Sequence, residues 1–296
     1  ENTIFMARKM INANIDVHVH PFLNEGWNRL EDVIEVMGRR GLDIIALESY
    51  NANLHSYVER EAYRLYGDGL VRDDVGVVIP DGKVIMKARE YNTKEDFHIL
   101  TVGCSFDDVG QETQIEEIIE RGLEKNALVV LDHPFVDNFK TRTAGHITEE
   151  QKGWLVGLCK KYSGKVAIEW NGYSIPWLRS GLRLPLAMLG YKTRYSDVNK
   201  HAKRLVNALK EDGYNVPLLA DTDLHARRRW LLEEMGAARF CTDVYGETPR
   251  EMLDSVISNV FSGRYVNVER YPSSAHVILG YCVPVLFPKI FPKPRA

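Results

Sequence analysis

The chain has 296 residues, of which 45% are hydrophobic and 27% charged, and its formal net charge at pH 7 is -3. This composition is typical of a globular protein with a sizeable core, and the charge gives no global indication of a nucleic-acid or membrane partner. The four cysteines form no CxxC pair, which argues against a disulfide framework or a structural zinc knuckle. No apolar run is long enough for a signal peptide or a membrane span, so we expect a cytoplasmic protein.

The first predicted element is a strand over residues 14–20, Asn-Ile-Asp-Val-His-Val-His. Alternation along an extended strand places Asp16, His18 and His20 on one face, backed by an apolar row on the other. Neutral imidazole and ionised carboxylate are usual ligands of first-row transition metals. The alternative is a half-buried strand whose histidines bond locally. Two histidines and an acid at period two, with further such pairs downstream, favour a metal site.

Helices and strands alternate along the rest of the chain. In chain order the apolar spacing predicts a helix at 27–40, a strand at 43–47, a helix at 54–66, strands at 75–80 and 84–90 joined by an Asp81-Gly82 turn, a strand-like run at 97–103, a helix at 111–125, a strand at 127–131, a helix at 148–161, a strand at 166–170, a helix at 197–210, a strand at 216–220, a run at 237–242 and a helix at 249–262. This alternation is typical of βαβ units and a mainly parallel sheet.

The clusters of histidine and acid residues lie at predicted strand ends, among them His18, His133, Glu169 and Asp223. Ligands of α/β folds gather where the strands end, and a barrel-like closure would bring these residues together, whereas an open sheet would spread them. We therefore predict a single barrel domain over residues 1–270. Residues 271–296 contain five prolines among apolar residues; we expect this tail to run extended along the surface or onto a partner subunit, as in a homo-oligomer.

An ordered set of motifs resembles the PHP (polymerase and histidinol phosphatase) family of metal-dependent phosphoesterases, over about residues 14–240. The set comprises Asp16-Val-His18-Val-His20, Glu90, His98-Ile-Leu, His133-Pro134 and Asp223-Leu-His225. The resemblance implies a distorted seven-stranded, TIM-like β/α barrel with two or three divalent transition metals (Mn, Fe or Zn) at its mouth. It implies ligand roles for seven residues: His18, His20, Glu90, His98, His133, Asp223 and His225.

Two stretches depart from the pattern of this family. Asn24-Glu25-Gly26 stands where Ser-Asp-Gly is usual, and Glu25 can replace the acid as a ligand with a longer arm. Glu48-Ser49-Tyr50 stands where Thr-Asp-His is usual, so a phenol occupies the position of an imidazole. Either Glu48 or His55 supplies a replacement ligand, or one metal position is empty.

Three acids at strand ends have less certain roles. Glu169 could bind a metal, orient a ligating histidine or be a solvated carboxylate. Asp221 shares a strand face with Asp223, although a turn-capping role fits almost as well. Asp132 is set aside because it should point away from the face of its neighbour His133 in a strand.

Residues 227–229, Arg-Arg-Arg, follow His225 after a single residue, Ala226. A charge run is usually a solvated helix face, but guanidinium groups beside a metal ligand suit phosphate oxygens. We therefore expect Arg227 or a neighbour to hold the phosphate. Trp170, Tyr173 and Trp177 could wall a pocket for a ring-bearing substrate, with core packing slightly favoured.

These features predict hydrolysis of a phosphate ester, in a small phosphorylated molecule, by a metal-activated water. His98 or His225 could protonate the leaving group, and Arg227 could clamp the phosphate. One alternative is an amidohydrolase-type barrel, which also opens with His-x-His but normally adds a ligating lysine and a lone late aspartate; Asp223-x-His225 disfavours it. The other is a degenerate barrel that binds metal without catalysis.

Overall fold

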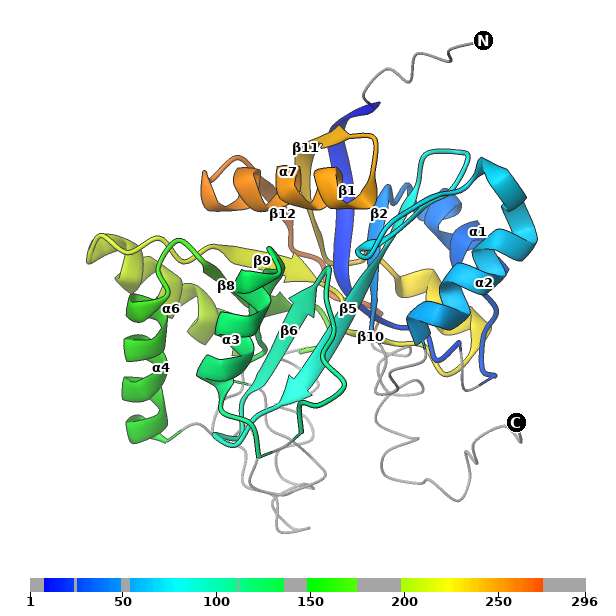
Figure 1. Ribbon diagram of the computed structural model, residues 1–296. Coiled ribbons are helices and arrows are strands. Elements are labelled where there is room, and N and C mark those ends of the chain that lie inside the picture. Colours follow the sequence, from blue (N-terminus) through cyan, green and yellow to red (C-terminus); the bar gives the residue numbers. More distant parts are fainter. Residues whose placement is uncertain are drawn as a thin grey trace.

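The computed structural model describes residues 8–23, 26–48, 54–110, 112–135, 148–174 and 198–273. In chain order its elements are β1 (Arg8–His20), α1 (Leu30–Arg40), β2 (Ile44–Glu48), α2 (Leu54–Tyr66), η1 (Gly67–Gly69), β3 (Val71–Arg72), β4 (Gly76–Val78), β5 (Val84–Asn92), β6 (His98–Val102), α3 (Ile115–Glu124), β7 (Leu128–Asp132), α4 (Glu149–Lys161), β8 (Val166–Asn171), α6 (Val198–Glu211), β9 (Leu218–Asp221), β10 (Leu224–His225), η2 (Arg229–Glu234), β11 (Arg239–Gly246), α7 (Pro249–Phe261) and β12 (Val266–Val268) (Figure 1). The predicted helices and strands are confirmed, with ends displaced by a few residues.

Local sequence signals explain where several helices begin and end. Helix α1 stops at Gly41, whose φ of 63° is the left-handed conformation that glycine adopts without steric cost. Helices α4 and α7 each begin with a capping box, in which Thr148 or Thr248 accepts a hydrogen bond from the backbone three residues later. These caps define the residues at which α4 and α7 begin.

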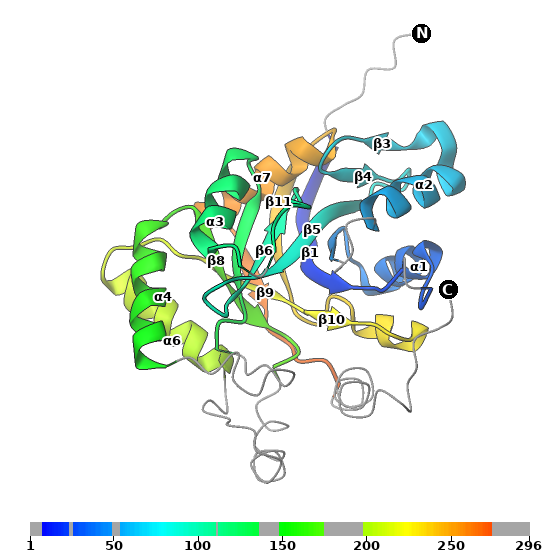
Figure 2. The ribbon, with the colours of Figure 1, turned by 60° about the horizontal axis from the view of Figure 1, so that its bottom comes forward.

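The strands form one nearly closed, mixed barrel sheet. Its continuous path runs β12-β11-β1-β2-β5-β6-β7-β8-β9, and β3, β4 and β10 join it at the side. The path therefore has nine strands among the described residues, not the seven expected, because β11 pairs antiparallel with β1 and β12 pairs antiparallel with β11 beyond it. Helices α3, α4 and α6 lie to one side of the strands and α1 and α2 to the other (Figures 1 and 2).

The expectation of a mainly parallel sheet is wrong at β6. This strand pairs antiparallel with both β5 and β7, because the connection after Asn92 is too short for a crossover helix. The reversal places the first residue of β6, rather than its last, at the rim where the parallel strands end. His98 consequently lies opposite both Asn92 and Asp132.

Side chains close the barrel between its two edge strands, β9 and β12. The backbone N–H of Ala220 donates to Asn267 Oδ1 at 3.0 Å, and Asn267 Nδ2 donates to the carbonyl of Leu218 at 2.7 Å. The N–H of Leu218 donates to the hydroxyl of Tyr265 at 3.1 Å. The amide of Asn267 thus satisfies backbone groups that a neighbouring strand would otherwise pair with.

Apolar residues fill three clusters that follow this architecture. One lies inside the barrel and is closed by α7 at the end where β1 begins; it includes Ile15, Val17 and Phe240. The second lies beneath α3, α4 and α6 and contains Trp170. The third lies beneath α1 and α2 and contains Val19. Apolar clusters thus cover both sides of the barrel wall, and polar residues gather at the rim where β1 ends.

Little of the predicted tail is described. Tyr271 packs its ring on Trp170 with centroids 4.9 Å apart, and Pro272 is buried. This contact supports the core interpretation of Trp170. Residues 274–296, with the other four prolines and the expected role in a homo-oligomer, lie outside the described residues, as does Trp177. Among the helices that the structure describes, none combines the length and the apolar composition needed to cross a membrane.

Candidate metal centre

The structure brings the seven implied ligands together at one rim of the barrel. They come from the ends of parallel strands, from the start of the reversed strand β6 and from the segment around β10: His18, His20, Glu90, His98, His133, Asp223 and His225. Their donor atoms fall into overlapping groups of at least three that lie within 4.8 Å of one another. The convergence expected of a barrel is therefore observed among the described residues.

Four donor atoms surround the first position. His18 Nε2 and His20 Nε2 are 2.9 Å apart, and each lies 3.5 Å from Asp223 Oδ1. Glu90 Oε2 is 3.9 Å from His18 Nε2 and 3.6 Å from His20 Nε2. A tetrahedral ion with ligands at about 2.0–2.1 Å has ligand-to-ligand separations of about 3.4 Å. Because two imidazole nitrogens this close need a cation or a proton between them, the donor set fits a transition metal.

A second group shares Glu90 with the first. Glu90 Oε1 contacts His98 Nδ1 and lies 3.4 Å from His133 Nε2. Asp223 Oδ2 is 3.9 Å from the same His133 nitrogen. Glu90 and Asp223 therefore each turn one oxygen toward the first group and the other toward the second, which is the arrangement of carboxylates shared between two neighbouring cations.

His225 lies beside the first group. Its ring stacks on that of His20 with centroids 4.2 Å apart, and its Nδ1–H donates to the carbonyl of Asp223 at 3.0 Å. Burial and the neighbouring His20 lower the pKa of His225 to about 3. The ring is therefore neutral near pH 7, with the lone pair on Nε2, which is the form that binds a metal.

Two buried glutamates orient the ligating histidines. His18 Nδ1–H donates to Glu169 Oε1 at 2.9 Å, and Glu169 Oε2 accepts from the backbone N–H of His133 at 2.6 Å. Glu48 Oε2 lies 2.5 Å from His20 Nδ1, and Glu48 Oε1 accepts from the backbone N–H of Glu90. Carboxylates that hold the second nitrogen of a histidine fix its tautomer and raise its basicity. Glu169 and Glu48 thus support ligands, and Glu48 is not itself a replacement ligand in this arrangement.

Asp132 was expected to point away from the site, which is wrong, and Asn171 was not considered. The carboxylate of Asp132 is fully buried 3.5 Å from His18 Nδ1. The alternation rule fails there because the next residue, His133, has a φ of 21° and is not extended. Asn171 Nδ2 donates to both Glu169 and Asp223. Its position at the end of a predicted strand, beside other polar strand ends, was the signal that could have identified it.

Asp221 is also buried at this rim. Its carboxyl group lies with that of Glu169 and the imidazole of His18 in a third group of donor atoms, and the His18 nitrogen next to Glu169 is Nδ1 rather than the Nε2 of the first position. Burial, followed by the negative charge of Glu169, raises the pKa of Asp221 well above its usual range. Asp221 therefore belongs to the layer behind the ligands.

Asp16 does not share the face of the two histidines, contrary to the expected alternation. The pairing of β1 with β2 contains an irregularity between Asp16 and Val19, so the side chains change phase within the strand. The Asp16 carboxylate accepts hydrogen bonds from the backbone N–H groups of Thr222 and Gly236, at 3.1 and 2.8 Å, and from the Thr222 hydroxyl. Asp16 is structural rather than ligating.

Several other predicted residues are not part of the centre, or lie outside what the structure describes. Glu25, Ser49 and Tyr50 are outside the described residues. His55 lies in a small cavity between α2 and β5, with Val58 and Met86, and burial lowers its pKa to about 3. It belongs to none of the donor groups found in the described part of the chain, so it does not replace the missing imidazole.

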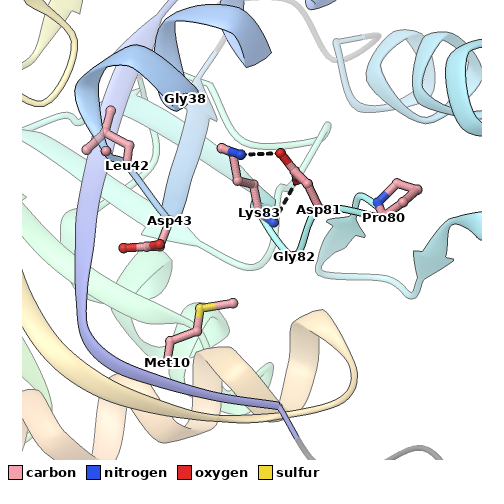
Figure 3. Close-up of a pocket in the computed structure, with 9 residues that line it drawn as sticks. Met10, Gly38, Leu42, Asp43, Pro80, Asp81, Gly82 and Lys83 are labelled. Atoms are coloured by element: carbon pink, nitrogen blue, oxygen red, sulfur yellow. Dashed lines mark hydrogen bonds and ion pairs between the residues drawn. The ribbon is translucent and has the colours of Figure 1, made fainter.

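A cavity of about 560 Å³ lies at the other end of the barrel (Figure 3). It is lined by Met10 in the first part of β1, by Asp43 just before β2 and by Lys83 just before β5. Lys83 pairs with Asp81, and Asp43 accepts from the backbone N–H of Asn14. Since its charged side chains are already paired within the cavity wall, the donor-rich rim is the better candidate site.

No protein-family model and no curated protein matches this sequence. Solved structures resemble it at low identity. A two-domain protein containing a predicted PHP-like metal-dependent phosphoesterase, from Bacteroides vulgatus, is 15% identical with a TM-score of 0.49; the match covers 89% of this chain and 66% of that one. Endonuclease Q in complex with a 27-mer duplex with an abasic lesion is 13% identical, with a TM-score of 0.44 and coverages of 86% and 57%. The lesion-specific endonuclease EndoQ from Pyrococcus furiosus gives 14%, 0.45, 85% and 56%.

The similar structures include a PHP-like phosphoesterase. This chain spans 66%, 57% and 56% of the length of these three structures. The comparison also corrects one expectation. Nothing in the sequence indicated nucleic acid and we expected a small phosphorylated molecule, whereas one of the similar structures is a complex with a 27-mer duplex substrate that has an abasic lesion at the active site.

Protonation of the centre depends on its carboxylates. Burial lowers the pKa of His20, but Glu48 and Asp223 outweigh it and raise the value to about 9. Burial also lowers the pKa of His133, but the hydrogen bond with Glu90 and the negative charge of Glu169 outweigh this effect and raise the pKa to about 10. In the metal-free protein both rings therefore hold at pH 7 a proton that an incoming metal must displace.

Metal affinity is consequently expected to rise with pH from about 6 to 9, by about tenfold per pH unit for each proton displaced. Calorimetric titration of metal-free protein with Mn²⁺, in two buffers of different ionisation enthalpy, measures the protons released. At pH 7 we expect at least one proton per metal. An affinity independent of pH over this range would contradict the protonation states assigned to His20 and His133.

Proposed function

We propose that this protein is a metal-dependent phosphoesterase that uses two divalent transition metals at the rim of the barrel. The observation that carries the proposal is the position of Glu90 and Asp223, whose carboxylates each face two adjacent groups of histidine nitrogens. Two cations in such a site activate a water and stabilise the attacking and leaving oxygens of a phosphoryl group.

In this proposal the chain supplies neutral imidazoles and negatively charged carboxylates as ligands for two cations. His18, His20, Glu90 and Asp223 would hold the first cation, with His225 beside them, and Glu90, Asp223, His98 and His133 would hold the second. Glu169 and Glu48 keep the His18 and His20 rings in the orientation that presents Nε2 to the cation. His98 contacts Glu90 through Nδ1, and His225 is neutral with a low pKa; both therefore fit the role of ligand better than that of proton donor to the leaving group.

The contacts of the shared carboxylates support this proposal over the amidohydrolase alternative. Among the described residues, every ion-pair partner of Glu90 and Asp223 is a histidine. An amidohydrolase-type centre would be expected to place a lysine between its metals. Arg227 is proposed to contact the phosphate, since its guanidinium lies 5.2 Å from the ring of Phe22, which itself neighbours His225.

Metal analysis combined with a panel of phosphate monoesters and diesters tests the proposal. We expect at least one equivalent of Mn, Fe or Zn after gentle purification, and turnover stimulated by Mn²⁺. His18→Ala is expected to lose metal and about 10³-fold or more in activity, since it removes a ligand of the first position. His201→Gln, a histidine outside the donor groups, is the matched control and should retain both.

The alternatives give different results in the same assays. Hydrolysis of amides or lactones alone would favour the amidohydrolase reading. Bound metal without turnover on any ester would favour a barrel that binds metal without catalysis. A fully folded wild-type protein with no metal and no metal affinity would refute the proposal.

A further inference from the structure

The three consecutive arginines after His225 have different partners. Arg229 forms ion pairs with Asp32 at 3.0 Å and with Glu35 at 2.8 Å, both on α1. Arg227 lies over the ring of Phe22 at 5.2 Å, and Arg228 lies over the ring of Trp27 at 4.9 Å. No carboxylate pairs with Arg227 or Arg228 among the described residues. Two of the three positive charges are therefore without a carboxylate partner there, and both guanidinium groups lie over aromatic rings instead.

Both aromatic rings belong to one short turn between β1 and α1. The N–H of Trp27 donates to the carbonyl of Phe22 at 3.3 Å, which holds the two residues side by side. The buried amide of Asn28 donates to the carbonyls of Pro21 and Ala226, at 2.7 and 2.5 Å. Those are the residues just before Phe22 and Arg227. The segment carrying the arginines is thus joined to the turn carrying the rings.

Arg227 lies nearer to the metal centre than Arg228. The ring centroid of Phe22 is 6.3 Å from that of His20 and 6.1 Å from that of His225. The N–H of Arg227 donates to the carbonyl of His225 at 3.2 Å. Arg228 is extended, with φ -149° and ψ 145°, and precedes η2, which lies beside α1 (Figure 2). Arg227 is therefore the inner guanidinium and Arg228 the outer one.

We propose that Arg227 and Arg228 form an anion-binding strip, and that the substrate carries at least two phosphate groups. Arg227 contacts the phosphate at the metal centre, and Arg228 binds a second one further out. Guanidinium groups bind phosphate oxygens by paired hydrogen bonds, and a ring beneath each group holds it in place without neutralising its charge. The inference rests on the proposed function and specifies the substrate class for that site.

Two kinds of compound supply this chemistry: a nucleic-acid strand, with successive phosphodiesters, and a compact molecule that bears two phosphates. Calorimetry on metal-loaded full-length protein distinguishes them with matched probes. Glucose 6-phosphate is compared with glucose 1,6-bisphosphate, and thymidine monophosphate with a single-stranded oligothymidylate of eight nucleotides. We expect the two-phosphate member of at least one pair to bind about tenfold more tightly than its single-phosphate partner.

Variants of the two arginines separate the outer site from the inner one. Arg228→Gln is expected to abolish that tenfold preference, and Arg228→Lys, which keeps the charge but not the paired geometry, to restore part of it. Arg227→Gln is expected to weaken binding of both members of a pair. Arg60→Gln is the matched control, because Arg60 also lies over an aromatic ring, that of Tyr57, but on α2; it should leave the preference intact.

The outcomes identify which idea fails. If single phosphates bind the metal-loaded protein but neither pair shows a preference, or if Arg228→Gln leaves the preference unchanged, the strip is refuted while the phosphoesterase proposal stands. If the protein takes up no metal and binds no phosphate, both are refuted. A preference for the oligonucleotide alone identifies a nucleic-acid strand as the source of the second phosphate, and a preference for the bisphosphate alone identifies a compact substrate.

Discussion

Replacement of Glu90 by glutamine should lower phosphoesterase activity by about 10³-fold or more and reduce the metal content by at least one equivalent. The carboxylate faces both donor groups, so an amide at this position removes a charged oxygen from each. Loss of several kcal/mol of transition-state stabilisation by the metals corresponds to a rate decrease of this size. Metal analysis of the purified variant and steady-state kinetics on the best phosphoester substrate measure the two effects.

Glu124→Gln provides the matched control for this substitution. Glu124 is exposed near the end of α3, so the same chemical change there should alter neither metal content nor turnover. A Glu90→Gln protein with two metals and normal kinetics would exclude the shared role of this carboxylate. Loss of activity with full metal content would indicate that Glu90 acts on the substrate rather than on the metals.

Asp16→Asn should destabilise the metal-free protein by about 3 kcal/mol or more while leaving the ligands in place. The groups that surround the carboxylate, including the N–H groups of Thr222 and Gly236 and the Thr222 hydroxyl, are donors. An asparagine would direct its own NH₂ at some of them, and a buried donor left without an acceptor costs about 1–3 kcal/mol. Denaturant unfolding of the metal-free variant and wild type measures the difference in free energy of unfolding.

Asp108→Asn is the comparison for this effect. Asp108 is exposed and makes two hydrogen bonds to Arg121, and an exposed ion pair of this kind contributes about 1 kcal/mol or less. Equal losses in the two variants would show that the buried hydrogen bonds of Asp16 carry no special weight. A large loss of metal affinity in Asp16→Asn, without loss of stability, would return Asp16 to the ligand set.

The seven residues proposed as ligands could be singled out because they lie in short motifs of histidine and acid residues at strand ends, and the structure brings them to one rim. His18 and His20 are separated by one residue, as are Asp223 and His225. Residues this close in the sequence are also close in space, whatever the long-range fold is. Their convergence followed from the rule that parallel strands present their ends at one rim. The position of His98 could not be derived from this rule, because His98 is the first residue of β6 and reaches the rim only since β6 runs antiparallel to β5 and β7.

The residues that were misassigned depend on departures from regular strand geometry. The irregularity between Asp16 and Val19 and the positive φ of His133 each reverse the direction of a neighbouring carboxylate. Such local changes are set by tertiary packing and leave no periodic signal in the sequence. Glu48 and Glu169 were recognised as relevant, but their task depends on contacts with residues 28 and 151 positions away, which spacing alone cannot reveal.

The side-chain closure between β9 and β12 has a consequence for the metal-free protein. Strands β9 and β12 are joined by the side chains of Asn267 and Tyr265 rather than by a full ladder of backbone hydrogen bonds. Strand β9 ends at Asp221 and leads into the segment that carries Asp223. A cation held by Asp223 together with His18 and Glu90 would add a link from that segment to β1 and β5, beside the backbone pairing that β10 already makes with β1. Metal binding would then stabilise the closed barrel, and each ligand that is removed would lower the free energy of unfolding of the metal-loaded protein.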